Sequence, residues 1–69
     1  MNYKLKDDYI PLNALLKVCD LVSSGGEANI VIINNEVKLN DKLVKEKRKK
    51  IRHGDKITFK NIDIFVTNE

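Results

Sequence analysis

Residues 23–35, SSGGEANIVIINN, decide the fold, because two interpretations of them conflict. Four consecutive β-branched side chains at 30–33 favour a strand. The residues before them favour a helix, since Ser24 and Glu27 have the spacing of a capping box. In that motif the Ser24 hydroxyl accepts a hydrogen bond from the Glu27 N–H, and the Glu27 carboxylate accepts one from the Ser24 N–H.

The apolar spacing and the end of this stretch also favour the helix. Three side chains would share one helical face: Ala28, Val31 and Ile32. Asn34-Asn35 is a suitable stop, because asparagine tolerates the positive φ with which helices commonly end. The residues therefore predict a short helix over 25–34, with a strand as the alternative.

A first helix is predicted on the N-terminal side. One stripe of apolar residues recurs at helical spacing: Leu12, Leu15, Leu16, Cys19 and Val22. Pro11 fits the first turn, where a missing N–H costs nothing. We predict a helix over 11–21 with Val22 at its frayed end, preceded by a short strand around residues 3–5. Cys19 is then a small buried filler rather than a nucleophile.

From Glu36 onward the period changes to two residues, which indicates strands. Val37 and Leu39 alternate with polar neighbours, and Asn40-Asp41 has the chemistry of a turn. These residues predict a short hairpin that continues to Leu43 beyond the turn.

Two more strands are predicted at the C-terminal end. Residues 53–55, HGD, form a turn, and Ile57 and Phe59 alternate in the strand that follows. Lys60-Asn61 connects that strand to a last one. In the last strand three side chains share a face: Ile62, Ile64 and Val66.

Sixty-nine residues are enough for one domain, which we place at 1–69. A hydrophobic content of 42% and a charged content of 33% fit a soluble globular chain. No apolar stretch has the length of a signal-peptide core or of a membrane span, so a cytoplasmic protein is expected. The single cysteine supplies neither an internal disulfide nor a zinc site.

Positive charge is concentrated in one part of the chain. Residues 42–56 contain eight lysines and arginines against two acidic residues, a balance of +6, whereas the other residues contain five against eight, a balance of −3. A clustered field attracts a polyanion. We name residues 45–52 the basic segment. Five of its cations are candidate phosphate contacts: Lys47, Arg48, Lys49, Lys50 and Arg52.

The basic segment lies between predicted strands, where Leu43 and Ile51 would anchor its backbone and hold the cations in a fixed array. A solvated face is the alternative, because most charge runs are no more than that. The chain has four aromatic residues: Tyr3, Tyr9, Phe59 and Phe65. None of them interleaves with the cations in the sequence, and although Tyr3 and Tyr9 could flank a base, nothing resembles the aromatic motif of an RRM. Recognition of folded RNA through backbone and shape is therefore favoured over stacking on single strands.

Other kinds of site have little support. His53 is the only histidine and has no evident partner for nucleophilic catalysis. One histidine and one cysteine without clustered carboxylates do not predict a metal site, and no cofactor is expected. The turn at residues 23–26 could offer N–H groups to a phosphate. Glu27 competes for the same donors, so a tight turn between helices is favoured.

Taken in order, these pieces resemble the RNA-binding domain of ribosomal small-subunit protein four, the S-four domain with its αL motif. The closest resemblance is to its small stand-alone YbcJ-like members. The matching pieces are SGGEA at 24–28, VKLN at 37–40, the basic run through Lys50, and Gly54-Asp55. The resemblance covers nearly the whole chain. It implies an α+β fold in which two short N-terminal helices pack on a small, mostly antiparallel sheet, with residues 30–33 helical.

The resemblance also implies that the second helix and the adjoining hairpin dock on structured RNA. Three residues would lie close to the phosphate contacts: Asn29, Lys38 and Asn40. Five would set the geometry of turns: Ser24, Gly25, Gly26, Gly54 and Asp55. Two cations common in the family are missing, since Asn29 stands in place of a lysine and Glu46 lies in the basic stretch. Affinity is therefore expected to depend strongly on residues 47–52.

Two other departures from the family concern turns. Asp41 replaces the usual hairpin glycine and Asn35 replaces a glycine before the strand, and both residue types tolerate left-handed positions.

The expected function is non-enzymatic binding of structured RNA, ribosomal or ribosome-associated, by a monomer that could also meet ribosomal proteins. Three alternatives remain open. A protein-interaction adaptor would carry the basic segment as a nonspecific surface. Association with anionic membranes would need more apolar residues beside the cations. An RNA-modifying enzyme would need a readable acid, base or nucleophile pair.

Overall fold

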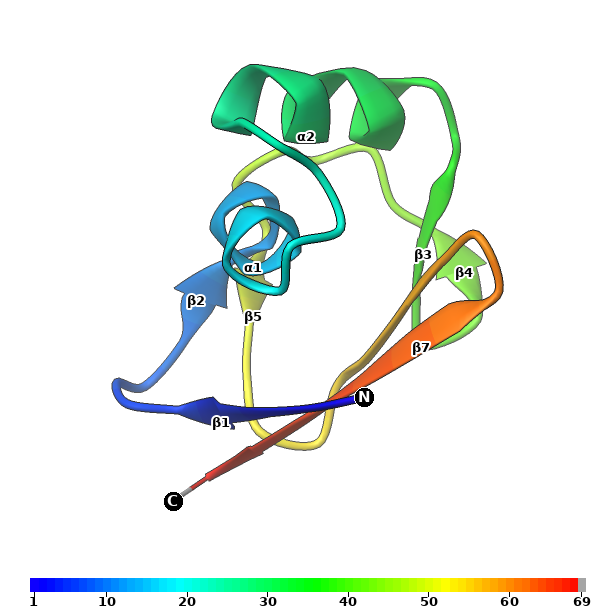
Figure 1. Cartoon of the computed structure of the whole chain (residues 1–69). Coiled ribbons are helices and arrows are strands. Elements are labelled where there is room, and N and C mark those ends of the chain that lie inside the picture. Colours follow the sequence, from blue (N-terminus) through cyan, green and yellow to red (C-terminus); the bar gives the residue numbers. More distant parts are fainter. Residues whose placement is uncertain (69) are drawn as a thin grey trace.

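Two short helices lie on one side of a twisted sheet in a computed structural model of the chain, which describes residues 1–68 (Figure 1). The helices are α1 (Leu12–Val18) and α2 (Gly25–Ile33). The strands are β1 (Asn2–Leu5), β2 (Ile10–Pro11), β3 (Val37–Leu39), β4 (Lys42–Leu43), β5 (Lys50–Ile51), β6 (Lys56–Phe59) and β7 (Ile62–Asn68). The predicted α+β class, with helices on a small sheet, is confirmed.

The main sheet has five strands in the order β1-β7-β6-β3-β4. All neighbours are antiparallel except β1, which runs parallel to β7 with Tyr3 beside Val66. A separate pair, β2 and β5, is antiparallel and joins Ile10 to Ile51. The sheet is therefore mostly antiparallel, as predicted. The pairing of β2 with β5 and the parallel position of β1 were not predicted.

Both predicted two-residue hairpin turns are present. Asn40 and Asp41 have φ of 51° and 70°, and Lys60 and Asn61 have φ of 50° and 69°. Two successive left-handed residues give the turn twist that matches the right-handed twist of the flanking strands. Asparagine and aspartate suit these positions better than other non-glycine residues do.

Helix α1 is shorter than the predicted helix over 11–21. Pro11 has an extended backbone, with ψ of 143°, and belongs to β2. At the other end Asp20 has φ of 60°, and the N–H groups of Asp20 and Leu21 donate to the carbonyls of Lys17 and Leu16. These two bonds form a Schellman motif, which ends the helix after Val18. The prediction that residues 19–21 continue the helix was wrong, although Val22 is buried.

Helix α2 confirms the helical interpretation of residues 25–33 and ends one residue before the predicted position. Asn35 has φ of 63°, and the N–H groups of Asn35 and Glu36 donate to the carbonyls of Ile32 and Val31. This is a second Schellman motif. The β-branched run is helical because the capping bonds at both ends of α2 and the burial of one face of the helix outweigh the strand propensity of its residues.

The cap at the start of α2 differs in one bond from the predicted capping box. The Glu27 N–H donates to the Ser24 hydroxyl at 3.1 Å, as predicted. The Glu27 carboxylate does not accept from the Ser24 N–H. It accepts from both the N–H and the hydroxyl of Ser23, each at 2.7 Å. Ser23 offers two donors to one oxygen, which explains why the carboxylate reaches one residue farther back.

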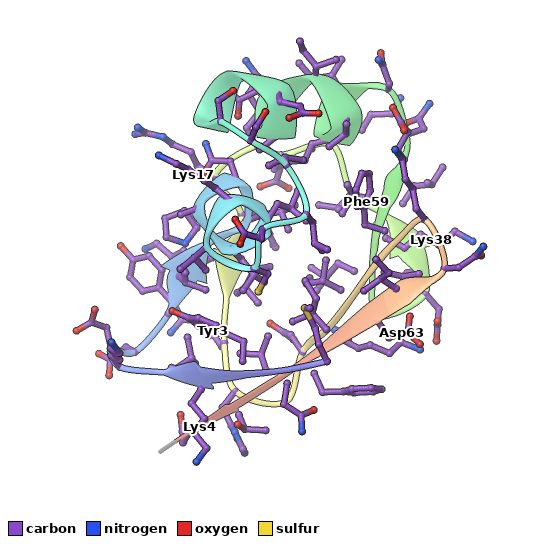
Figure 2. All side chains as sticks on the ribbon, viewed as in Figure 1. Tyr3, Lys4, Lys17, Lys38, Phe59 and Asp63 are labelled. Atoms are coloured by element: carbon purple, nitrogen blue, oxygen red, sulfur yellow. The ribbon has the colours of Figure 1, made fainter. Side chains whose placement is uncertain are left out.

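The core lies between the helices and the main sheet. It consists of fifteen buried apolar residues: Leu5, Leu12, Leu15, Leu16, Val22, Ala28, Val31, Ile32, Val37, Val44, Ile51, Ile57, Phe59, Ile64 and Val66. Phe59 points into this interior, and Lys4 lies below β1 on the side away from the helices (Figure 2). The predicted inner face of α2 is confirmed. In β7, Ile64 and Val66 are buried, whereas Ile62 at the strand end is partly exposed.

Candidate functional site

The basic segment runs from the β3–β4 hairpin behind α1 to β5 (Figure 1). Its backbone is bound to the beginning of α1. The Leu12 N–H donates to the Lys49 carbonyl at 2.9 Å, and the Asn13 N–H donates to the Lys47 carbonyl at 3.0 Å. Pro11, the N-cap residue, supplies no side-chain cap. Carbonyls of the basic segment therefore satisfy two N–H groups that would otherwise lack partners, and the segment is fixed at that point.

Apolar side chains anchor the basic segment at both ends. Ile51 is fully buried, as predicted. Leu43 was predicted to be the other anchor, and this was wrong, since it is 55% exposed. Leu43 lies directly opposite Lys38 in the β3–β4 pair and so shares the solvent face of that strand. Val44, the next residue, points inward and is the anchor, with its N–H donating to the Val37 carbonyl at 3.3 Å.

The cations of the basic segment point into solvent. Lys49 is half-buried, and the others are exposed: Lys45, Lys47, Arg48, Lys50 and Arg52. Within residues 1–68 none of these six forms an ion pair. Their charge is therefore not neutralised inside the protein and is available to an anionic partner.

Asn29 of α2 lies beside the basic segment through a contact that the sequence did not reveal. The Asn13 side-chain amide donates to the Asn29 Oδ1 at 3.1 Å. The backbone N–H of the same Asn13 binds the Lys47 carbonyl. Asn13 thus joins α1, α2 and the basic segment, and places the predicted site residue Asn29 next to them.

A second network fixes the far end of the basic segment. The Asp55 carboxylate accepts from the Arg52 N–H at 2.8 Å and from the Asn40 side-chain amide at 3.1 Å. The Asn40 Oδ1 accepts from the Lys56 N–H at 2.9 Å. The predicted site residue Asn40 is therefore engaged in holding the hairpin against the turn at Asp55. Lys38, another predicted site residue, is exposed on β3.

The three glycines of the predicted site have different roles. Gly54 has φ of 92°, which only glycine adopts easily, so the turn before Asp55 requires it. Neither Gly25 nor Gly26 has a positive φ in the left-handed range, and an added Cβ would meet nothing at Gly25 and only the Ser24 hydroxyl, at 3.8 Å, at Gly26. The backbone geometry gives no reason for glycine at these two positions.

Tyr9 lies against the cations, although it does not interleave with them in the sequence. The Lys50 Nζ is 5.0 Å and the Arg52 Cζ 5.7 Å from the centre of the Tyr9 ring. These distances are those of cation–π contacts. The antiparallel pairing of β2 with β5 brings them together, and Tyr9 remains 39% exposed. No local sequence signal reveals this contact, because it depends on the pairing of Ile10 with Ile51, which are far apart in the chain.

The fold and these contacts can be compared with known protein families. A family model described as S4 domain matches residues 3–67 of the 69-residue chain. The chain belongs to the S4 domain family. S4 domains are RNA-binding, non-catalytic domains, so membership assigns RNA binding as the general function. The resemblance inferred from the sequence is confirmed. No curated protein sequence matches the chain.

Cys19 and His53 are the two side chains of this S4 domain that were weighed for nucleophilic catalysis. Cys19 is half-buried, and this burial raises the pKa of its thiol. A raised pKa keeps the thiol protonated and less nucleophilic. The His53 Nδ1 accepts a hydrogen bond from the Asn68 N–H at 3.1 Å. In the part of the chain that is described, no three side chains of His, Cys, Asp or Glu gather to hold a metal ion.

One exposed ion pair supports the hairpin of the S4 domain. The Lys56 Nζ donates to the Asp41 Oδ1 at 2.9 Å. This bond lowers the pKa of the Asp41 carboxyl and raises the pKa of Lys56. Pairs exposed to water contribute little to stability, so the hairpin depends more on the Asn40 and Asp55 network. Within residues 1–68, no helix is long and apolar enough to cross a membrane.

Proposed function

We propose that this S4 domain binds structured RNA, ribosomal or ribosome-associated, through the basic segment. Five side chains would contact phosphates: Lys47, Arg48, Lys49, Lys50 and Arg52. The observation that supports this most strongly is that the cations form no ion pair within residues 1–68 while the backbone is fixed at both ends. A fixed array loses less conformational entropy on binding than a flexible tail does.

The neighbouring residues have separate parts in this function. Asn29 and Lys38 would contact a sugar or a base edge, whereas Asn40, Ser24, Gly54 and Asp55 would hold the turns that present the surface. Gly25 and Gly26 leave the first turn of α2 without side chains, which allows an RNA backbone to approach it. Residues 1–69 act together as one domain, monomeric and cytoplasmic, without a cofactor.

A second function, binding of a protein partner, is supported by a different observation. Ile30 and Ile33 lie on the outer side of α2 and are more than half exposed. Exposed apolar residues that lie one turn apart can contact another protein, such as a ribosomal protein. In an adaptor of this kind the basic segment would be a nonspecific surface.

The test is binding to a structured ribosomal RNA fragment across a salt series, with duplex DNA of equal length as competitor. If about four phosphates are neutralised, affinity should fall roughly a hundredfold between about 50 and 200 mM salt. A steep dependence with preference for RNA supports the proposal. Weak binding at low salt, or equal binding to DNA, would contradict it and favour the adaptor.

A further inference from the structure

A hollow of about 530 Å³ opens between the β3–β4 hairpin and the beginning of the basic segment. Eight residues line it: Leu39, Asn40, Lys42, Leu43, Val44, Lys45, Glu46 and Lys49. Its volume is within the range of sites that hold small organic molecules. The hollow adjoins the proposed phosphate contacts but has a different composition, because it combines apolar, cationic and carboxylate groups.

The apolar part of the hollow includes one large side chain that lies on the solvent face of the hairpin. Leu43 is a large apolar residue, yet it is more than half exposed, next to Lys42 in the chain and opposite Lys38 on the neighbouring strand. Leu39 is half-buried and Val44 is buried. Together they give the hollow an apolar wall, on which the flat face of a ring could lie.

The charged part consists of three lysines and one carboxylate. Lys42 and Lys45 are exposed and Lys49 is half-buried. Glu46 lies among them, yet within residues 1–68 its carboxylate forms no ion pair and no hydrogen bond. The Glu46 carboxylate, the three cations and the apolar wall together match the three parts of a nucleotide. The cations suit its phosphate, the wall suits its base, and the carboxylate suits an amino group on the base edge.

We propose that this hollow holds one unpaired nucleotide of the bound RNA and that Glu46 selects a base with an amino group at that position. The inference rests on the proposed RNA binding and specifies which part of the RNA is read. Structured RNA presents unpaired bases in loops and bulges. Cytosine offers an amino donor at N4, whereas uracil has a carbonyl oxygen at the same place, which the Glu46 carboxylate repels.

Glu46 also orients the nucleotide. A phosphate and a carboxylate repel each other, so the phosphate is directed to Lys42, Lys45 and Lys49 and the base edge to Glu46. This gives a reason for an acidic residue inside the basic segment, where its charge alone would weaken RNA binding.

The test uses two hairpin RNAs with the same stem, one closed by a loop of cytidines and the other by a loop of uridines. We expect the wild-type chain to bind the cytidine loop about fivefold to a hundredfold more tightly, the discrimination typical of one well-made base contact. Glu46→Gln should lose most of this preference, because an amide can donate as well as accept. Its overall affinity should rise, since one negative charge is removed.

Glu36→Gln is the matched control, since Glu36 is exposed, lies outside the hollow and carries the same charge. It should keep the preference for the cytidine loop. Leu43→Ala, at an exposed position, should weaken binding to the cytidine loop and leave binding to a blunt duplex of the same stem unchanged. Circular dichroism shows whether each variant is folded.

The outcomes separate this inference from the proposed function. Equal, steeply salt-dependent binding to both loops by the wild-type chain would overturn the nucleotide site and leave RNA binding intact. A preference that persists unchanged in Glu46→Gln would overturn the role of Glu46. Absence of salt-dependent binding to either hairpin would overturn both.

Discussion

Gly26 and Gly54 differ in backbone conformation, so replacing each of them by alanine should have opposite effects on stability. Gly54 has a left-handed backbone, whereas Gly26 is in the first turn of α2 without a positive φ in that range. We expect Gly54→Ala to lower the free energy of unfolding by about 1–2 kcal/mol, the cost of a left-handed alanine. Gly26→Ala should raise it by about 0.4–1 kcal/mol, because it reduces the freedom of the unfolded chain.

Urea unfolding of the two variants measures both effects, and each variant is the control for the other. A loss of stability in Gly26→Ala as large as that in Gly54→Ala would contradict this account of the glycines.

Tyr9 is expected to contribute to RNA affinity through its exposed ring. It is held beside Lys50 and Arg52, and an unpaired base that stacks on an aromatic ring gains about 1–3 kcal/mol. Tyr9→Leu should therefore weaken binding to a hairpin RNA by about fivefold or more, measured by fluorescence anisotropy. Phe65→Leu is the control, since Phe65 is also exposed but lies on β7, away from the basic segment. Equal losses in both variants would show that the ring of Tyr9 has no special role.

The sequence predicted best the backbone conformation of residues whose own side chains favour that conformation. Asn35 and Asp41 were expected at left-handed positions and are found there, and Asn40 lies in the predicted turn. The partner of the Glu27 carboxylate was predicted to be the Ser24 N–H, and this was wrong, because Ser23 is also a serine with a donor N–H and it is the one that donates. Only the path of the chain decides between them.

The beginning of α2 should make the stability of the fold depend on pH. The pKa of Glu27 lies below its ordinary value of 4.5, first because the Ser23 N–H donates to the carboxylate and second because the Ser23 hydroxyl does. The folded state thus favours the ionised form. The resulting stability is present above pH 4.5 and is lost as the pH falls through the lowered pKa.

Glu27→Gln removes this titrating group, so its thermal midpoint should change less between pH 6 and pH 3 than that of the wild type. Ser24→Ala, which removes the other cap bond but no carboxyl group, is the control. It should lower stability by about 1 kcal/mol and keep the wild-type dependence on pH. Parallel pH profiles for wild type and Glu27→Gln would contradict the assignment of the carboxylate.

Helices and hairpins were predictable because their signals are local. The capping serine, the apolar stripe and the turn residues all lie within a few positions of each other. The two-residue strands β2 and β5 have no such signal, since their pairing joins Ile10 to Ile51. The same pairing places Pro11 in a strand, which removes one residue from the start of α1, and it brings Tyr9 to the cations. The larger error at α1 is at its other end, where the left-handed backbone of Asp20 ends the helix.

The distribution of charge over the whole chain leads to a further prediction. Lys47 and Lys50 lie in the basic segment, whereas Lys4 and Lys6 are exposed near β1, and Lys4 points away from the helices (Figure 2). Replacing Lys47 and Lys50 by Gln should weaken RNA binding and reduce the slope of log affinity against log salt by about 2.

The paired variant Lys4→Gln with Lys6→Gln changes the net charge by the same amount. It should leave the slope within error of the wild type, as determined from the same salt series. Equal reductions in both double variants would mean that net charge, and not the position of the basic segment, governs binding.

Titration of the isotopically labelled protein with a structured ribosomal RNA fragment, followed by amide NMR shifts, locates the surface on which the RNA binds. We expect the largest changes at residues 45–52, at Tyr9 and at Asn29, with small changes along β1 and β7. Changes centred on Ile30 and Ile33 or on Phe65, with the amides of the basic segment unaffected, would contradict binding through the basic segment.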